Sequence, residues 1–226
     1  MTTETKPNCI GIILDGNRRW AKNNNLPSLE GHRQGVERMR DVSRWVRDRD
    51  IKHLAVYAFS TENWSRGQEE VNYLLKLLRT AIDTFVSELA KEDIRIKFVG
   101  ERNRFDEDTR EAMSNVEEKS SENEKLTLWV CLSYGGRAEI VKAVNSLSKG
   151  ADVTEEVLSQ NLWTQGMPDP DIIIRTGGEK RLSGFLTWQS VYSELFFIDE
   201  YWPDFSEKIL DRVLSEFSER TRRMGR

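Results

Sequence analysis

Two arginines and a serine follow a short apolar run late in this 226-residue chain. The run Ile172–Ile174 leads into Arg175, the Gly177–Gly178 pair, Arg181 and Ser183. Three β-branched residues suit a strand buried on both faces, and paired glycines let the backbone turn where side chains would clash. Arginine offers a planar fork of donors that fits carboxylate or phosphate. The two arginines, with the free amides of the turn between them, predict a polyanion site; the alternative is a surface loop with solvated charges.

A second charged loop of this design lies near the N-terminus. The apolar run 9–14 is followed by Asp15, Gly16, Asn17, Arg18, Arg19 and Trp20, where a helix is expected to begin. The unpaired amides of a first helical turn attract phosphate, and an aspartate at a strand end can hold Mg²⁺ through a carboxylate oxygen. The same residues also suit a plain helix cap. Neither Gly-x-x-x-x-Gly-Lys-Ser/Thr nor Gly-x-Gly-x-x-Gly occurs, so a nucleotide-binding loop is not supported.

A third polar loop combines hydrogen-bonding groups with aromatic rings. It follows the apolar run 54–59 and contains Ser60, Thr61, Glu62, Asn63, Trp64 and Arg66. Aromatic rings beside polar groups suit a ligand with one apolar end and one charged end. The alternative is a strand terminus anchored by a buried tryptophan. His32, between Gly31 and Gly35, is a further candidate contact, although a lone histidine is more often structural.

The elements that must position these loops alternate regularly along the chain. Strands are predicted at 9–14, 53–59, 94–99, 126–132, 171–175 and 194–198, with helical patterns between them. Such alternation predicts a single α/β domain over residues 1–226, in which helices flank a mostly parallel six-stranded sheet. Ligands of such sheets bind beyond the carboxyl ends of the strands. All three charged loops begin at that edge, so the expected fold and the expected site agree.

Two of the helical segments carry different patterns. From Val71 to Leu89, apolar residues recur at helical spacing, which ordinarily marks a face packed on the core. Residues 106–123 are polar and mostly acidic. We expect a solvated helix with no chemistry there.

Composition limits the classes of function. The net charge of −4 gives no electrostatic reason to expect nucleic acid binding. The two cysteines, Cys9 and Cys131, lie in strand-like apolar runs and are expected to be buried free thiols of a reducing compartment. No signal peptide is recognisable, and no apolar run approaches the roughly 18 residues of a membrane span. We expect a cytoplasmic protein that contacts the bilayer at most peripherally.

Six motifs occur along the chain in a fixed order. They are Asp-Gly-Asn-Arg-Arg-Trp-Ala-Lys at 15–22, Gly-His-Arg-Gln-Gly at 31–35, Tyr-Ala-Phe-Ser-Thr-Glu-Asn-Trp at 57–64, Ser-Tyr-Gly-Gly-Arg at 133–137, Arg-Thr-Gly-Gly-Glu-Lys-Arg-Leu-Ser at 175–183 and Trp-Pro-Asp-Phe at 202–205. With these motifs the chain resembles the cis-prenyltransferases, in particular bacterial isoprenyl transferases of the undecaprenyl diphosphate synthase type. The resemblance extends from about Ile10 to the C-terminus.

The resemblance implies a fold, a cofactor and a reaction. The fold would be an α/β domain in which the stripe helix and the sheet enclose a hydrophobic tunnel. The reaction would be Mg²⁺-dependent condensation of isopentenyl diphosphate with an allylic diphosphate, farnesyl diphosphate being the expected one. The product would be a Z-polyprenyl diphosphate such as undecaprenyl diphosphate, a lipid carrier for cell-wall synthesis.

Roles for individual residues follow from the same resemblance. Asp15 would hold Mg²⁺ with Glu194 as a second metal-linked carboxylate, and Asn63 would orient or relay the proton that is lost. Substrate contacts are implied for Gly16, Asn17, Arg18, Arg19, Trp20 and His32 at the allylic diphosphate, for Ser60, Thr61, Glu62, Trp64 and Arg66 in the third loop, and for Arg175, Arg181, Leu182 and Ser183 at isopentenyl diphosphate. The implied tunnel lining is Ala58, Leu75, Leu78, Ile94, Leu126 and Leu128.

Several positions depart from the family pattern and leave alternatives open. Ser28 stands where the family often has an arginine that contacts the allylic diphosphate. A synthase of short chains, or one that joins prenyl units irregularly, would share all six motifs. A non-catalytic subunit that binds prenyl diphosphates is a more distant alternative. Such members tend to lose the metal aspartate or the 175–181 loop, and this chain keeps both. Arg223–Gly225 resembles an ending that reaches the neighbouring subunit's site, which implies a homodimer.

Overall fold

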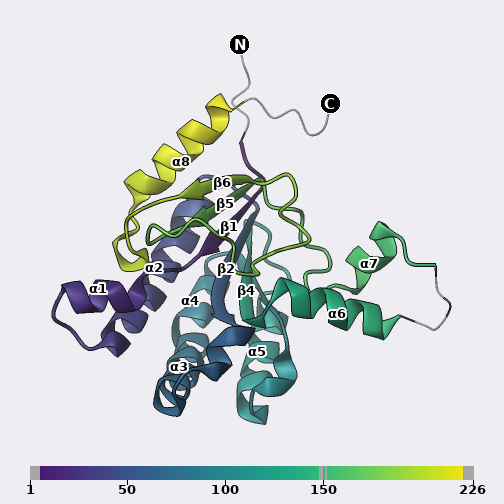
Figure 1. Cartoon of the computed structure of the whole chain (residues 1–226), viewed down its shortest axis with the longest axis horizontal. Helices are drawn as coiled ribbons and strands as arrows, with labels where there is room; N and C mark the ends of the chain where they lie inside the picture. Colours follow the sequence, from purple (N-terminus) through teal and green to yellow (C-terminus); the bar gives the residue numbers. More distant parts are fainter. Residues whose placement is uncertain (1–5, 148–149, 151, 221–226) are drawn as a thin grey trace.

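Six parallel strands form the sheet at the centre of the computed structural model, which describes residues 6–147, 150 and 152–220 (Figure 1). The strands are β1 (Cys9–Ile13), β2 (His53–Ser60), β3 (Ile94–Val99), β4 (Leu126–Tyr134), β5 (Ile172–Arg175) and β6 (Glu194–Phe197). Their order is β3-β4-β2-β1-β5-β6, and every neighbouring pair is parallel. The predicted α/β fold with six strands is confirmed, and no strand end differs from its prediction by more than two residues.

Helices connect the strands along most of the described chain. The α-helices are α1 (Asn17–Asn23), α2 (Ser28–Asp48), α3 (Gln68–Ala81), α4 (Ser87–Lys91), α5 (Glu107–Lys119), α6 (Gly136–Ser146), α7 (Glu155–Asn161) and α8 (Glu207–Glu219). Short 3₁₀ helices span Thr61–Ser65, Arg102–Arg104 and Trp202–Asp204. In Figure 1, α6 and α7 lie to one side of the sheet, while α3, α4 and α5 gather below it.

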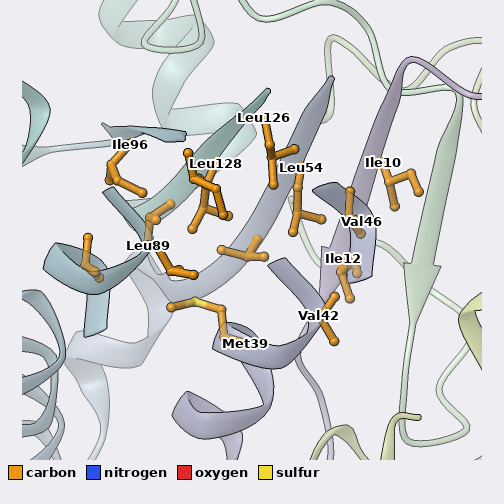
Figure 2. Packing of buried hydrophobic residues seen from close by; sticks show 14 of the residues in the cluster. Ile10, Ile12, Met39, Val42, Val46, Leu54, Leu89, Ile96, Leu126 and Leu128 are labelled. Atoms are coloured by element: carbon orange, nitrogen blue, oxygen red, sulfur yellow. The ribbon is translucent and has the colours of Figure 1, made fainter. Parts of the chain in front are cut away.

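Side chains on the two faces of the sheet belong to different core clusters, because successive residues of a strand point to opposite faces. Ile12 and Leu54 point to one face, where they pack with Met39 of α2 (Figure 2). Ala55 points to the other face, which Phe185 covers from the long connection between α7 and β6. Helices therefore cover mainly the first face, and loop segments cover much of the second.

The predicted apolar stripe from Val71 to Leu89 runs through α3, a π-helical turn (Ile82–Val86) and α4. A π-turn inserts an extra residue into the helical repeat and shifts the phase of the side chains after it. Val71 and Leu89 are buried in the core, whereas Leu75 is only partly buried against it. The middle of α3 is therefore left beside open space.

The polar segment 106–123 forms α5, and the carboxylate of Asp106 caps it by accepting from the Thr109 amide at 2.8 Å. The expectation of a solvated helix is correct for its polar positions and wrong for its inner face. Met113 and Val116 are buried, since residues three or four positions apart return to the same helical face.

Cys9 and Cys131 are buried free thiols, as predicted, and burial raises the pKa of both. Within the described ranges, no helix combines the length and apolarity needed to cross a membrane.

Candidate functional site

Two cavities meet at the carboxyl edge of the sheet. The outer cavity, about 820 Å³, is lined by one carboxylate, Asp15, and by the cations Arg18, Arg19, Lys22 and Arg66, with Ser28 also in the wall. The inner cavity, about 170 Å³, is enclosed mainly by apolar side chains of β2, α2, α3 and the π-turn. Both linings include Leu14, Asn17, His32 and Arg66. A charged mouth therefore continues into an apolar interior.

The register of the sheet brings Asp15 and Arg175 together. Ile13 pairs with Arg175 across β1 and β5, so both strands end at the same level. Asp15 Oδ2 accepts a hydrogen bond from Arg175 Nη2 at 2.9 Å, and Oδ1 lies 3.1 Å from Arg19 Nη2. The Thr176 hydroxyl accepts from the Asp15 amide at 3.0 Å and donates to its carbonyl oxygen at 2.7 Å. The Asp15 carboxylate is thus fixed between two guanidinium groups.

Arg175 connects the N-terminal loop with the 175–183 loop. Its side chain is only 5% exposed, and Nη1 donates both to Ser183 Oγ at 2.8 Å and to the Arg181 carbonyl oxygen. Its Nε is buried without a hydrogen-bond partner in the described part of the chain. A buried donor without a partner is costly, and a bound anion would satisfy it.

The Gly177–Gly178 turn differs from its prediction. The first amide donates to the Glu200 carbonyl oxygen at 2.8 Å, and the second donates to that of Ile198 at 2.9 Å. For these two residues the prediction of free amides was therefore wrong, because the backbone after β6 already uses both amides. Arg181 is exposed and pairs with Glu179, while Leu182 packs against the second core cluster.

Helix α1 also begins differently from its prediction. Its N-cap is Gly16, at φ 105°, and no side chain caps the helix. A Cβ at Gly16 would lie 2.6 Å from the ring of Tyr201, so the close approach requires glycine. Asn17 donates weakly to the Leu14 carbonyl oxygen at 3.4 Å, and its Oδ1 is buried without a partner in the described chain. Because Asp15 does not cap the helix, its carboxylate remains available to the arginines.

Three cavity-lining residues converge on Glu70, in the first turn of α3. Glu70 Oε1 accepts from Arg66 Nη1 at 2.9 Å and lies 3.6 Å from His32 Nε2. Glu70 Oε2 lies 3.6 Å from Arg18 Nη1. One carboxylate therefore links α1, α2 and the loop after β2. Glu70 is not among the residues predicted from the sequence, although its i,i+4 spacing from Arg66 is typical of an ion pair.

His32 lines both cavities and is neutral at pH 7. Its burial, with the charges of Arg66 and Arg18, lowers the pKa of the imidazole to about 4, although Glu70 acts in the opposite direction. Nε2 is buried and has no hydrogen-bond partner in the described part of the chain. A neutral ring can offer this nitrogen to a ligand either as a donor or as an acceptor.

Asn63 caps the 3₁₀ helix Thr61–Ser65. Its Oδ1 accepts from the Ser60 amide at 3.0 Å, while the Ser60 side chain accepts from the Asn63 amide. This capping box fixes the side chain beside the inner cavity, which Asn63 lines. The cap uses only the amide oxygen, so the Nδ2 donor is not needed for it.

Other predicted contacts have packing or surface positions. Trp64 donates from Nε1 to Ser133 Oγ at 2.9 Å. Trp20 donates from Nε1 to Asp204 Oδ1 at 2.7 Å, which ties α1 to the 202–204 segment. Neither of the two described cavities has in its lining Trp20, Ser60, Thr61, Glu62 or Trp64.

The inner cavity includes three of the six predicted tunnel residues. Leu75 and Leu78 of α3 line it together with Ala58 of β2. Ala58 is the extra residue of a β-bulge, because the pairing with β4 passes from Tyr57 directly to Phe59. Bulges bend a strand and redirect a side chain, often beside an active site.

The other three predicted tunnel residues do not line this cavity. Ile94, Leu126 and Leu128 are fully buried in the packed core. They lie in the amino-terminal halves of β3 and β4, whereas the cavity reaches these strands at Phe98 and Val130. The prediction is therefore corrected: in this conformation the open space ends before it reaches them.

The predicted role of Glu194 as a second metal-linked carboxylate beside Asp15 is also corrected, because the two residues of one chain lie far apart. It begins β6 at the level of Ile172, three residues before Arg175, which places it roughly 10 Å down the strand from the level of Arg175. Its carboxylate accepts from Arg220 Nη1 at 2.7 Å. Glu194 thus lies at the amino edge of the sheet and does not join Asp15. The predicted partner contact at Arg223–Gly225 lies outside the described residues.

The donor set at the outer cavity restricts the kind of metal binding. No group of three His, Cys, Asp or Glu side chains in the described ranges could hold a metal ion. Asp15 is the sole carboxylate in the described lining of the outer cavity, where cations surround it. These residues fit Mg²⁺ in its common arrangement, in which one carboxylate and the phosphates of a ligand share the ion.

Comparisons with known proteins agree over nearly the whole chain. A family model described as putative undecaprenyl diphosphate synthase matches residues 13–225. A Micrococcus luteus protein named ditrans,polycis-undecaprenyl-diphosphate synthase ((2E,6E)-farnesyl-diphosphate specific) is 42% identical, with 97% of this chain and 91% of that protein aligned. An isoprenyl transferase of Thermotoga maritima is 42% identical over 97% of each chain.

Two solved structures are similar at 31% sequence identity. Lavandulyl diphosphate synthase from Lavandula x intermedia, in complex with dimethylallyl diphosphate, gives a TM-score of 0.92 over 98% of this chain and 99% of that one. A probable undecaprenyl diphosphate synthase from Campylobacter jejuni gives 0.84 over 98% and 100%.

Proposed function

The chain belongs to the undecaprenyl diphosphate synthase family of prenyltransferases, and we propose that it condenses isopentenyl diphosphate with farnesyl diphosphate to form a Z-polyprenyl diphosphate. The observation that carries the proposal is the pair of joined cavities. A cationic mouth of about 820 Å³ opens through His32 and Arg66 into an apolar space. That shape fits a molecule with a diphosphate head and a hydrocarbon tail.

The allylic diphosphate occupies the outer cavity in this proposal. Arg18, Arg19 and Arg66 provide the cationic donors, and Lys22 adds a point charge at the rim. His32 meets the phosphates or the first carbons of the tail at the junction of the cavities. Departure of the diphosphate breaks the bond between carbon and oxygen, and the oxygen keeps the electron pair. Preorganised cations stabilise this developing charge.

Asp15 is the residue that would hold Mg²⁺ together with phosphate oxygens of the substrate. When bound, the ion supplies further positive charge to the departing diphosphate. Arg175 and Arg19 already hold both carboxylate oxygens of Asp15. Either arginine can move to a phosphate when the carboxylate changes partner.

Isopentenyl diphosphate is assigned to the second arginine loop. Arg175 Nε has no hydrogen-bond partner among the residues that the structure describes, Arg181 is exposed, and Ser183 is held by Arg175. The double bond of isopentenyl diphosphate attacks the allylic carbon as the diphosphate leaves, and a proton is then lost from the new unit. We propose that Nδ2 of Asn63 orients this step and that the released diphosphate accepts the proton, because a neutral amide is a poor base.

The length of the product is the least constrained part of the proposal. An inner cavity of about 170 Å³ is similar in size to the roughly 150 Å³ cavity that holds a benzene molecule in another protein. A long product would therefore require the middle of α3 to move away from β2. The small cavity favours a second candidate, a synthase of short or irregularly joined chains.

A homodimer is also proposed. Leu195 on the edge strand β6, and Val191 and Tyr192 just before it, are exposed large apolar residues. An exposed apolar edge strand is a surface that a second copy of the chain would cover. In this proposal the protein is cytoplasmic, and peripheral contact with the membrane would serve release of the product.

Mass analysis of dephosphorylated products tests the proposal. Purified protein is incubated with Mg²⁺, isopentenyl diphosphate and farnesyl diphosphate, with Asp15→Ala as the inactive control. Products near eleven isoprene units identify a long-chain synthase, and products of a few units identify the short-chain candidate. Wild-type protein that gives no product with C5, C10 or C15 primers would contradict catalysis and favour a binding subunit.

A further inference from the structure

We propose that Glu70 is a positioning residue for the allylic diphosphate, because its carboxylate holds Arg18 and Arg66 side by side at the outer cavity. The inference rests on the proposed function and identifies what prepares the phosphate site before substrate arrives. Glu70 does not itself line the outer cavity, whereas both arginines and His32 do. It therefore lies behind the surface that the phosphates would contact.

The contacts with Glu70 leave most N–H donors of Arg18 and Arg66 available for a phosphate. Arg66 approaches Oε1 with Nη1 at 2.9 Å, and Arg18 approaches Oε2 with Nη1 at 3.6 Å. A guanidinium group has five N–H donors. Because each arginine directs only one terminal nitrogen at Glu70, the remaining donors can bind phosphate. The carboxylate aims the two cations and does not block them.

Electrostatics explains why such a residue is needed. Two guanidinium groups that bind one diphosphate must lie close together, and like charges at that range repel. The side chain of Arg18 is 59% exposed, so it could otherwise rotate into solvent. A carboxylate between the two offsets the repulsion and orders both long side chains before binding. Ordering them in advance lowers the entropy lost when the ligand binds.

His32 belongs to the same arrangement in a looser way. Its Nε2 lies 3.6 Å from Glu70 Oε1, which is too far for a hydrogen bond. The carboxylate can attract the ring N–H without capturing it, so the nitrogen remains available to the ligand at the junction of the cavities.

The chain offers a matched control in Glu69. Both glutamates lie in the first turn of α3, where a negative charge stabilises the helix N-terminus. Glu69 is exposed, and no ion pair joins it to any residue that the structure describes. Glu69→Gln removes the same charge from the same helical turn and leaves the arginines alone. A difference between the two variants therefore reports the contact with Arg18 and Arg66.

The test is calorimetric binding of farnesyl diphosphate, and separately of inorganic diphosphate, to wild-type, Glu70→Gln and Glu69→Gln proteins. We expect Glu70→Gln to raise Kd for both ligands by about tenfold, the size of one lost charge-assisted contact. Glu69→Gln should stay within about twofold. In steady-state assays, KM for farnesyl diphosphate should rise in Glu70→Gln, while KM for isopentenyl diphosphate should change little.

An unchanged or lower Kd in Glu70→Gln would overturn the proposal, since the carboxylate would then be idle or would compete with phosphate. If that variant is poorly folded, Glu70→Asp decides the question. It keeps the charge but is one methylene shorter, so it should recover the affinity in part, and no recovery would also overturn the proposal. Failure of the proposed function has a different signature: wild-type protein would bind inorganic diphosphate yet form no prenyl product.

Discussion

The side-chain amide of Asn63 has a structural role, which is the helix cap, and a proposed chemical role, which is to orient the proton transfer. Its oxygen closes the cap on the Ser60 amide, and its nitrogen is free of that cap. Aspartate keeps an acceptor in the same place but has no N–H donor. Asn63→Asp should therefore keep the stability of the wild type and lose at least about tenfold in kcat, if the donor orients the proton transfer. Thermal unfolding and single-turnover rates measure the two effects separately.

Asn63→Ala is the companion variant. It removes both the cap and the donor, so it should lose about 1 kcal/mol of stability in addition to turnover. Near-normal turnover in the alanine variant would eliminate Asn63 from the chemistry. Near-normal turnover in the aspartate variant alone would assign it the acceptor role.

The neutral imidazole of His32 predicts a pH dependence of stability. Its folded pKa of about 4 lies below its ordinary value of 6.5, so the unfolded chain binds more protons between these values. Stability from this group is fully present above pH 6.5 and is lost as the pH falls toward 4. Between pH 7 and pH 5 the loss is about 2 kcal/mol. His32→Gln should remove this part of the loss in urea unfolding, and an equal loss in both proteins would contradict the assignment.

At the scale of elements, the packing of α1 on α2 positions Arg18 and Arg19. A Cβ at Gly31 of α2 would lie 2.0 Å from the Asn17 carbonyl oxygen, so Gly31→Ala must push α1 outward. We expect a loss of about 2–3 kcal/mol in unfolding free energy, a typical cost of overpacking, and a higher KM for the allylic substrate. Gly67→Ala is the control, because a Cβ there meets no atom within 4 Å. Equal behaviour of the two variants would mean that α1 can shift without cost.

Elements were easier to predict from sequence than their contacts. All six predicted strands are present. Strands such as β1 are continuous apolar runs, the pattern of buried parallel strands, whereas β3 alternates apolar residues with Arg95 and Lys97. The amides of Gly177–Gly178 and the level of Glu194 depend on which strands become neighbours. No local pattern specifies that β6 lies beside β5. The bulge at Ala58 is likewise a property of pairing with β4, so it could not be read from β2 alone.

The positions of candidate site residues were predicted correctly where a motif follows a strand end. Asp15, Arg18, Arg19, His32 and Arg66 all lie at the outer cavity, as the loops at the strand ends required. The polar residues 60–62 are adjacent in sequence to Asn63 but do not share its cavity, because a 3₁₀ helix turns neighbouring side chains to different sides. The contacts of Glu70 could not be predicted in full, because its i,i+4 pair with Arg66 is local, whereas Arg18 and His32 approach it from α1 and α2.

For the molecule as a whole, we expect the free space beside Ala58 to limit the length of the prenyl product. Ala58 stands at a bulge in the wall of the inner cavity, and a larger side chain would fill part of its roughly 170 Å³. Ala58→Leu should shorten the products by one or more isoprene units and leave KM for isopentenyl diphosphate nearly unchanged. Product masses measure the change. Val141→Leu, at an exposed position of α6, is the control, and unshortened products from Ala58→Leu would show that growth proceeds along another route.

The neighbours of β1 also have a consequence during protein synthesis. Asp15 and Arg175 are 160 positions apart, so a ribosome adding roughly 5–20 residues per second needs on the order of ten to thirty seconds between them. During that interval β1, which is buried throughout in the finished fold, has no partner on the side later taken by β5. Unpaired apolar edges promote aggregation of nascent chains. The emergence of residues 172–175 therefore both completes the surroundings of Asp15 and covers one unpaired apolar edge of the growing chain.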